Sequence, residues 1–252
     1  MSLDLRRPAR ALAVGAHPDD VEFGCGGTLA KWAGGGTTIM HVVCTDGAKG
    51  SWDPDEPVGQ LVATRQDEQR AAARALGGSG DDVVFLGYTD GELQAGIDER
   101  RELVRWIRRL QPDVVLGHDP WRRYRLHPDH RQAGFLVTDA IVAARDPHFF
   151  PDLGPAPHRP SALLLWEADE PNHTEDITAS FDRKLHALLA HRSQFRSTHR
   201  IDDPADEAQV ERFRARVMAR AAEHAVDEHG VDAHRADAHV ELGERFRIIT
   251  EL

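Results

Sequence analysis

The sequence of 252 residues predicts an α/β fold: a Rossmann-like, doubly wound, mostly parallel sheet with helices on both faces, then C-terminal helices and a closing strand. Short apolar runs alternate with longer segments of helical periodicity from residue 11 to residue 166. The runs are continuously apolar rather than alternating, as expected for strands buried on both faces. Strands and helices that alternate in this way form parallel sheets between two helical layers.

The expected elements follow one another in order. The apolar run Ala11–Gly15 predicts the first strand, and a helix over residues 21–33 then begins at the acidic pair Asp19-Asp20. The remaining strands of the parallel sheet are expected at residues 38–44, 83–86, 113–117 and 162–166. The helices between them are expected at residues 64–76, 99–110 and 128–145. Residues 46–61, 118–126 and 146–160 are expected to be long loops, which often carry function.

The last quarter of the chain has a different pattern. Helices are expected over residues 182–190 and 208–225, and alternating apolar residues predict a closing strand over residues 240–248. The chain contains no internal repeat and no segment with the composition of a linker, so residues 1–252 are expected to form a single domain.

Charge and composition exclude several classes of protein. Acidic residues outnumber basic ones by 42 to 31, and the net charge of −11 repels a phosphate backbone, so nucleic acid is not an expected partner. No apolar run approaches the roughly 20 residues of a membrane span, and the first residues do not resemble a signal peptide. We expect a cytoplasmic protein, and homo-oligomerisation stays open. Cys25 and Cys44 match neither a disulfide framework nor a CxxC metal site and are expected to be core residues.

Two short polar segments point to chemistry. His17 and Asp20 lie three residues apart after the first strand, a spacing that lets both side chains reach one metal ion. A catalytic zinc needs a third protein ligand, and the segment His127-Pro128-Asp129-His130 follows the fourth strand of the parallel sheet. In a doubly wound sheet with the strand order 3-2-1-4, the carboxyl ends of strands one and four face a shared crevice. His130 is therefore expected to join His17 and Asp20.

The remaining polar residues of the two segments suit acid-base catalysis. Asp19 lies beside a ligand and is free to take a proton from a metal-bound water as general base. His127 is expected to protonate a leaving amine or stabilise an oxyanion, with Asp129 orienting it. Metal binding can lower the pKa of water from about 15.7 to roughly 7, and a positioned acid or base adds about 10²- to 10⁴-fold in rate. Hydrolysis of an unactivated amide needs both effects.

A purely structural interpretation competes with this one, because Asp19 and Asp20 could cap the helix that follows them. Two unrelated caps do not readily explain a His-Pro-Asp-Asp segment and a His-Pro-Asp-His segment, each after a parallel strand. The pair of segments therefore favours the metal site.

These residues resemble a known family, the LmbE-like or PIG-L-type zinc N-deacetylases, which remove acetyl groups from N-acetylglucosamine-containing molecules. Residues 16–22 with Gly26-Gly27-Thr28 resemble the first signature of the family, and residues 127–130 resemble the second. The resemblance implies three zinc ligands: His17, Asp20 and His130. It also implies Asp19 as the base and His127, held by Asp129, as the electrostatic or acid partner.

Arg65 and Asp90 fall where family members contact the sugar, and a guanidinium and a carboxylate suit the hydroxyl groups of a glycan. Other interpretations are open for both. Arg65 could form a surface ion pair with Glu68 on the same helix, and Asp90 before Gly91 could be a turn residue.

The sequence departs from some family members before the second signature. In those members a tyrosine two residues before the first histidine helps to stabilise the oxyanion. Arg125 stands at that position here, and Tyr124 comes one residue earlier. Either the loop brings Tyr124 to the site or Arg125 supplies a positive charge. His118, before Asp119-Pro120, is expected to be a loop residue.

Other functions remain as alternatives. Two histidines and a carboxylate also describe the metal site of non-haem Fe(II) oxidoreductases, and a metal-dependent phosphoester hydrolase or a non-catalytic metal- or sugar-binding homologue would keep the same residues. The segment Gly24-Cys25-Gly26-Gly27 lacks the spacing of a dinucleotide-binding loop. The expected cofactor is one zinc ion, although the same ligands accept Fe(II), Co(II) or Mn(II). The expected partner is a small N-acetylated sugar or glycoconjugate.

Overall fold

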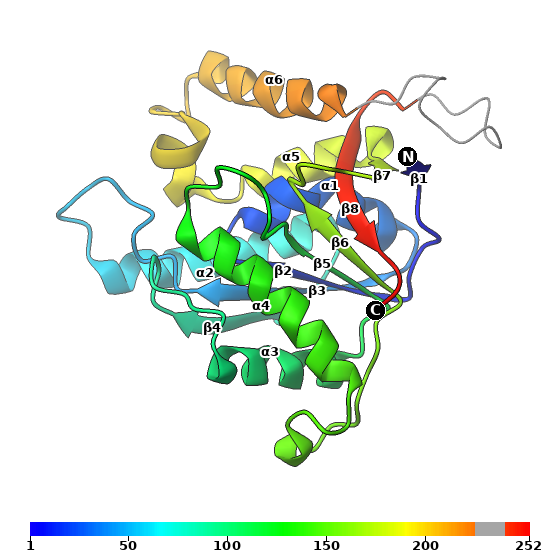
Figure 1. Cartoon of the computed structure of the whole chain (residues 1–252). Coiled ribbons are helices and arrows are strands. Elements are labelled where there is room, and N and C mark those ends of the chain that lie inside the picture. The colour runs from blue at the N-terminus through cyan, green and yellow to red at the C-terminus, as the bar shows by residue number, and fades with distance from the viewer. Residues whose placement is uncertain (225–239) are drawn as a thin grey trace.

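The computed structural model describes residues 1–224 and 240–252, and Figure 1 shows a sheet between layers of helices. Within the described residues the sheet has eight strands in the order β1-β7-β8-β6-β5-β2-β3-β4. The strands are β1 (Ser2–Leu3), β2 (Arg10–Gly15), β3 (Thr38–Thr45), β4 (Val83–Tyr88), β5 (Val114–His118), β6 (Ala162–Trp166), β7 (His173–Asp176) and β8 (Gly243–Ile249).

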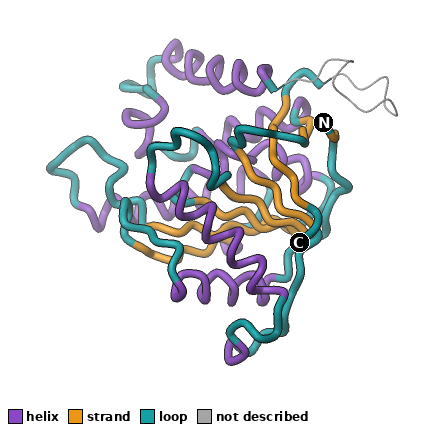
Figure 2. The backbone as a smooth tube through the Cα atoms, viewed as in Figure 1, coloured by secondary structure: helices purple, strands orange, loops and turns teal. Residues whose placement is uncertain are grey.

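Helices cover both faces of this sheet, as Figures 1 and 2 show. On one face lie α3 (Ile97–Leu110) and α4 (Pro128–Arg145), and on the other lie α1 (Asp20–Gly34), α2 (Val58–Leu76) and α5 (Phe181–Leu188). The helix α6 (Glu207–Glu223) packs outside α5 through a small apolar cluster of its own. Among the described residues, no helix combines the length and the hydropathy needed to cross a membrane.

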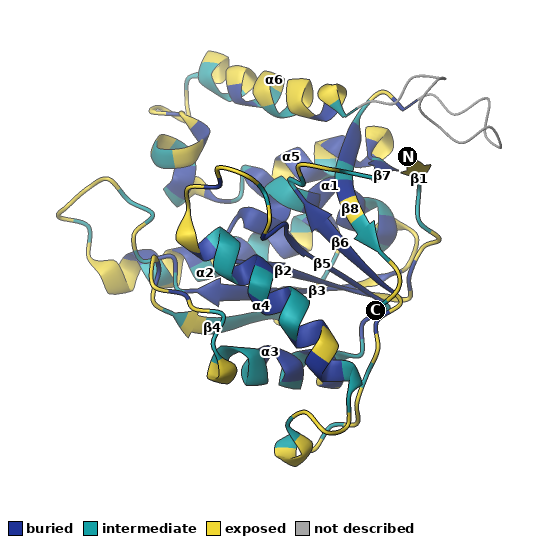
Figure 3. Cartoon of the chain, viewed as in Figure 1, coloured by how far each residue is buried: buried dark blue, intermediate teal, exposed yellow. Residues whose placement is uncertain are grey.

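The central strands are apolar on both sides because two cores meet on them. Leu12 and Val14 of β2 pack into the core under α3 and α4, whereas Ala11 and Ala13 pack into the core under α1. All four side chains are fully buried, and Figure 3 shows the middle of the sheet in the colour of buried residues. The continuous apolar pattern of the sequence therefore reflects burial from two directions.

The predicted fold class is confirmed, and so is the predicted order of the parallel strands. The strands β4, β3, β2, β5 and β6 lie side by side in this order, and each pair within this group is parallel. The closing strand β8 is antiparallel to both β6 and β7. It begins at Gly243, three residues after the predicted start. Residue 225, the predicted end of the helix that corresponds to α6, lies outside the described residues.

Two strands and the start of one helix were not predicted. The strand β7 has the sequence His-Thr-Glu-Asp and no apolar period, and it joins the sheet through main-chain pairing with β1 and β8. The helix α2 begins at Val58, six residues before the predicted start and inside a predicted loop. Pro57 precedes its first residue, in a position where the fixed φ of proline favours the start of a helix. Gly59 weakened the helical pattern of the first turn.

A buried carboxylate binds main-chain N–H groups at a point where the helical conformation of α1 is interrupted. Cys25 has a φ of −148° and a ψ of 17°, which are not helical values. The residues after it resemble the start of a new helix, whose first N–H groups lack partners within the helix. Glu244 of β8 accepts hydrogen bonds from the N–H groups of Gly27 at 2.9 Å and Thr28 at 2.8 Å. Its charge is paired with Nζ of Lys184 at 2.6 Å.

We expect Glu244→Gln to destabilise the protein because it leaves the ammonium group of Lys184 buried without its carboxylate. Breaking a buried pair in this way costs about 3–5 kcal/mol in the free energy of unfolding. Urea denaturation followed by circular dichroism measures the change. Glu241→Gln is the matched control, because Glu241 is exposed and should change stability by less than about 0.5 kcal/mol. Equal losses in the two variants would contradict a role for the buried pair.

His199 is the polar member of an otherwise apolar cluster between α1 and α6. Its ring is fully buried, and ring centroids lie 4.4 Å away for Phe213, 5.4 Å for Phe195 and 5.8 Å for Phe23. Burial lowers the pKa of His199 to about 3, and the nearby charges of His191 and Arg216 act in the same direction. The imidazole is therefore neutral in the folded protein at neutral pH.

This burial makes stability depend on pH. The pKa of His199 is about 6.5 in an unfolded chain and about 3 in the folded protein, so between these values the unfolded chain binds the extra proton. The contribution of neutral His199 is fully present above about pH 6.5 and is lost as the pH falls toward 3, by up to about 1.4 kcal/mol per pH unit. His199→Phe should reduce the slope of unfolding free energy against pH, measured by urea denaturation. The exposed His186 provides a control, and His186→Gln should leave the slope unchanged.

Candidate metal centre

The candidate site lies at the carboxyl ends of two neighbouring parallel strands. Val14 of β2 is paired with Gly117 of β5, so the segments that follow these strands leave the sheet side by side. The first of them contains His17, and the second leads into α4, which begins at Pro128. In Figure 2 the loops after β3, β4 and β5 gather at the same edge. A cavity of about 560 Å³ opens there.

Three donor groups converge in this cavity. Nδ1 of His17 lies 3.2 Å from Nε2 of His130 and 3.3 Å from a carboxylate oxygen of Asp20. Nε2 of His130 lies 3.2 Å from the other oxygen of Asp20. The structure therefore brings together the two histidines and the aspartate that the sequence predicted as ligands, although His17 and His130 are 113 residues apart.

The spacing of these donor groups suits a small divalent ion. Zinc binds imidazole nitrogens and carboxylate oxygens at about 2.0–2.2 Å, so neighbouring donors of a tetrahedral site are about 3.3–3.5 Å apart. The two imidazole nitrogens are 3.2 Å apart, and each lies 3.2–3.3 Å from one of the two oxygens of Asp20, so the separations are close to this value. Two nitrogens and one carboxylate also match the donor set of catalytic rather than structural zinc sites.

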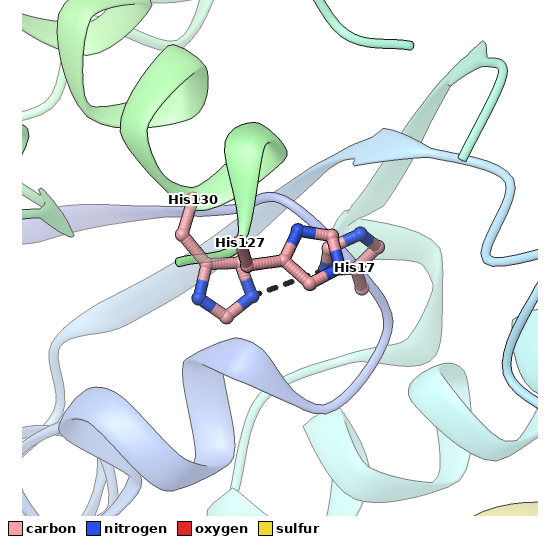
Figure 4. Close-up of side chains that lie close together, drawn as sticks. All are labelled: His17, His127 and His130. Atoms are coloured by element: carbon pink, nitrogen blue, oxygen red, sulfur yellow. Dashed lines mark hydrogen bonds between the residues drawn. The ribbon is translucent and has the colours of Figure 1, made fainter. Parts of the chain in front are cut away.

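Ring orientations distinguish the converging donors from His127, although a ring nitrogen of His127 lies within 4.8 Å of those of His17 and His130. Figure 4 shows His17, His127 and His130 close together, with a hydrogen bond between His130 and His17. The rings of His127 and His130 are stacked, with centroids 4.7 Å apart and planes at 18°. Because the lone pair of an imidazole nitrogen lies in the ring plane, two stacked rings cannot point at one ion. The rings of His17 and His130 are inclined at 54° and can converge.

The second nitrogen of His17 faces two carboxylates. Nε2 lies 3.1 Å from Oδ2 of Asp129 and 3.1 Å from Oδ1 of Asp90. A carboxylate that accepts from the far nitrogen of a ligand histidine fixes its tautomer and leaves the near nitrogen for the metal. Asp129 is fully buried and also accepts from the N–H groups of Gly91 at 2.6 Å and Leu93 at 3.2 Å. Burial alone would raise the pKa of Asp129, but these hydrogen bonds hold it below its usual value.

This arrangement corrects one prediction. Asp129 was expected to orient His127, whereas the histidine that its carboxylate contacts is His17. The reason is the position of Asp129 in the first turn of α4, where its side chain points into the protein while the ring of His127 lies at the cavity.

Asp19 lines the cavity beside the three donors. Its φ of 99° is unusual for a residue other than glycine, and the strained main chain is held by a hydrogen bond from its N–H to Oε1 of Gln69 at 3.0 Å. Burial raises the pKa of Asp19 to about 6, against the opposing charge of Arg65, whose guanidinium lies 3.8 Å from the carboxylate. The Asp19 side chain makes no capping hydrogen bond to α1, so the capping interpretation is wrong for this residue. The side chain of Asp20 accepts from the N–H of His17 at 2.7 Å, which lies before the helix.

A buried polar network holds Gln69 in turn. Its amide nitrogen donates to Oε1 of Glu22 at 2.8 Å and lies 3.3 Å from Nδ1 of His41. The other oxygen of Glu22 is 3.3 Å from Nε2 of His191. All four side chains are buried, so the network forms a rigid support behind Asp19.

Arg65 and Asp90, the two residues predicted to contact substrate, both line the cavity. Arg65 is buried and donates to the carbonyl oxygens of Gly47 at 2.8 Å and Pro18 at 2.7 Å, so the surface ion pair with Glu68 does not form. Asp90 is buried as well. Burial alone would raise the pKa of Asp90, but contacts that include His17 lower it to about 2. Because its carboxylate contacts His17, the interpretation of Asp90 as a turn residue alone is insufficient.

The two predicted oxyanion donors do not line the cavity. The prediction for Tyr124 is wrong, because this residue is 92% exposed on the loop before α4. Arg125 is buried, but its guanidinium is paired with Glu167 at 2.9 Å and lies behind the histidines, 3.3 Å from Nδ1 of His130. Its charge is therefore paired with Glu167, a residue of the cavity wall. His127 lines the cavity, and burial lowers the pKa of its ring.

His118 was expected to be a loop residue, and this prediction is wrong. It is the last residue of β5, is buried, and has Nε2 at 3.2 Å from Oδ2 of Asp20. The signal was its position directly after the predicted strand 113–117, at the carboxyl edge where His17 follows β2. The cavity is also lined by Lys49 and Gln194, for which the sequence offered no comparable signal.

A doubly wound sheet with two histidines and an aspartate converging at its carboxyl edge, and a second aspartate beside them, defines a metal-dependent α/β enzyme. The chain belongs to the PIG-L family, because the family model described as GlcNAc-PI de-N-acetylase matches residues 12–141. The family is metal-dependent.

Relatives with named activities agree with this assignment. The diacetylchitobiose deacetylase of Thermococcus kodakarensis is 36% identical over 189 residues, which cover 74% of this chain and 70% of that protein. The 1D-myo-inositol 2-acetamido-2-deoxy-alpha-D-glucopyranoside deacetylase of Streptomyces scabiei is 36% identical over 169 residues, or 58% of this chain and 52% of that protein. The structure of N,N'-diacetylchitobiose deacetylase from Pyrococcus horikoshii matches with a TM-score of 0.81 and 31% identity, covering 96% of this chain and 84% of that one.

The ring orientations predict which histidine the metal requires. His130→Ala should reduce metal affinity by at least about 10-fold, because it removes one of three converging donors. His127→Ala should leave the metal content near one ion per chain, because its ring cannot share an ion with the stacked His130. Metal content after gel filtration, measured by inductively coupled plasma mass spectrometry, tests both variants. Loss of metal in the His127 variant with retention in the His130 variant would reverse the assignment.

Proposed function

We propose that this protein is a zinc-dependent hydrolase that removes an acetyl group, or another acyl group, from the amide nitrogen of an N-acetylglucosamine-type small molecule or glycoconjugate. The observation that carries the proposal is the position of Asp19. Its carboxylate lines the same cavity as His17, Asp20 and His130 but is not one of the three converging donors. An acid-base group beside a metal site is what amide hydrolysis needs.

The proposed ligands of the ion are His17, Asp20 and His130. When bound, a divalent ion supplies Lewis acidity, which polarises the amide carbonyl and acidifies water. We propose zinc because the donor separations and the set of two imidazoles and one carboxylate fit its preferences. Fe(II), Co(II) and Mn(II) accept the same ligands.

Asp19 and His127 are the proposed proton carriers. As water adds to the carbonyl carbon, Asp19 takes one of its protons, and burial keeps the pKa of this carboxyl near 6, within the range suited to a general base. When the carbon–nitrogen bond breaks, His127 gives a proton to the amine. Burial lowers the pKa of His127, which makes its protonated form a better acid. Acetate and the free amine leave, and exchange with solvent restores both residues.

Arg65 and Asp90 are the proposed contacts to the sugar. Both line the cavity, on the side where Lys49 also lies, and a carboxylate and cationic N–H groups suit sugar hydroxyls. The relatives named above act on diacetylchitobiose and on an N-acetylglucosaminyl inositol, which places N-acetylated glucosamine derivatives first among the substrates to test. An oxidoreductase with the same three ligands would have no use for Asp19 and His127, so deacetylation is the better explanation of the whole site.

Asp19→Asn tests the mechanism. It should lower kcat for release of acetate from N-acetylglucosamine derivatives by about 10²- to 10⁴-fold, because a positioned base contributes that much. The metal content should remain near that of the wild type, because Asp19 is not a proposed ligand. Diacetylchitobiose and an N-acetylglucosaminyl inositol are the first substrates, with acetate measured by a coupled assay.

Asp67→Asn is the matched control, because Asp67 is exposed on α2, and this variant should keep wild-type activity. Full activity of the Asp19 variant on every amide that the wild type cleaves would overturn the proposed base. A wild-type protein that holds its metal and cleaves no N-acetylated sugar would overturn the proposed substrate class.

A further inference from the structure

We propose that His118 is a positioning residue for the metal site: it donates its Nε2–H to Oδ2 of Asp20 and so directs the other oxygen of Asp20 toward the ion. The indole of Trp166 fixes the tautomer that makes this possible. The inference rests on the proposed ligand set of His17, Asp20 and His130, and it goes beyond the proposed function because it assigns a role to two residues outside that set.

The protonated nitrogen of His118 follows from the groups around it. Nε1 of Trp166 lies 3.0 Å from Nδ1 of His118, and an indole nitrogen can only donate. Nδ1 is therefore an acceptor without a proton. The ring proton of His118 then lies on Nε2.

The proton on Nε2 faces Oδ2 of Asp20 at 3.2 Å. The main-chain N–H of Ala16 also lies near Nε2, but at 3.5 Å it is too far away to compete as a strong hydrogen bond. The same oxygen accepts from the main-chain N–H of His17 at 2.7 Å. Two donors thus hold Oδ2, and the carboxylate cannot rotate without losing both. Oδ1 lies 3.2 Å from Nε2 of His130. Oδ2 also lies 3.3 Å from Nδ1 of His17, but the two donors occupy its lone pairs, which leaves Oδ1 for the proposed ion.

His118 is not itself a ligand, although it lies with Asp20 and His130 in a group of possible donors. Its ring is stacked on that of His130, with centroids 4.4 Å apart and planes at 20°, so their lone pairs cannot meet at one ion. Its Nδ1 faces Trp166 and Arg125, and its Nε2 carries the proton. Neither nitrogen has a lone pair to offer the metal.

The sheet and the helix α1 hold the indole in place. His118 and Trp166 are the last residues of β5 and β6 and are paired in the register of these parallel strands. The ring of Trp166 is fully buried and lies against Gly24, where an added Cβ would come within 2.5 Å of the indole. Gly24 therefore allows α1 to press on the indole, and the donor that sets the tautomer has little freedom to move. A partner fixed in this way is typical of residues that orient metal ligands.

Metal affinity tests the proposal without the need for a substrate. Zn(II) or Co(II) is titrated into the metal-free protein in competition with a chelator. His118→Phe removes both nitrogens, whereas Trp166→Phe keeps His118 and removes the indole N–H that sets the tautomer. We expect affinity about 10- to 100-fold weaker for His118→Phe, the range typical when the partner of a ligand is lost, and a smaller loss for Trp166→Phe. His118→Gln, whose amide can accept from the indole and donate to Asp20, should restore most of the affinity.

His158→Phe is the matched control, because His158 contacts the carbonyl oxygen of Pro112 away from the site and should bind metal like the wild type. Wild-type affinity in both His118→Phe and Trp166→Phe overturns the proposal, and Trp166→Phe alone decides it if His118→Phe does not fold. The absorption spectrum of the Co(II) protein gives a second readout. An unchanged coordination number at saturating Co(II) in His118→Phe supports the proposal, whereas loss of a ligand overturns it. A wild-type chain that binds no metal would instead refute the proposed function.

Discussion

The parallel pairing of β2 with β5 is the constraint on which the whole site depends. Because Val14 lies opposite Gly117, the segments that begin at His17 and at His127 leave the sheet next to each other. The sequence of α1 and the sequence of α4 each carry only part of a donor set. Strand pairing joins the parts, and it does so at the carboxyl edge, where a doubly wound sheet leaves a crevice between diverging connections. The rest of the site is built outward from that crevice.

The chemistry of the crevice follows from a concentration of carboxylates. Asp19, Asp20, Asp90 and Asp129 lie within one buried region, where repulsion between like charges is little screened by water. His17 offsets part of this charge: burial would lower its pKa, but hydrogen bonds with three of the aspartates raise it well above the usual value. The remaining excess of negative charge favours a bound cation. Asp19 accepts no hydrogen bond from His17, and burial raises the pKa of its carboxyl group to about 6.

The residues around the three converging donors show which contacts the sequence could predict and which it could not. The convergence of His17, Asp20 and His130 could be predicted because the spacing of short motifs and the order of strands are local or topological properties. The partner of Asp129 could not, because it depends on which way a side chain leaves the first turn of α4, and the structure turns it to His17. Tyr124 failed as a prediction for a related reason, since the conformation of the loop before α4 places it in solvent. His118 was missed because a histidine at the end of a strand has no motif of its own.

The sequence by itself determined the alternation of strands and helices, the order of the parallel strands and the residues that supply the donors. These features follow from the apolar periodicity and from two short motifs. Periodicity and motifs both depend on residues that are near one another along the chain. Only the tertiary structure decided that β7 joins the sheet and which residue each aspartate contacts. It also decided that the rings of His127 and His118 stack on that of His130, and that an indole faces His118. Each of these depends on the direction of a side chain or main-chain group relative to residues far along the chain, and burial against those residues is what sets it.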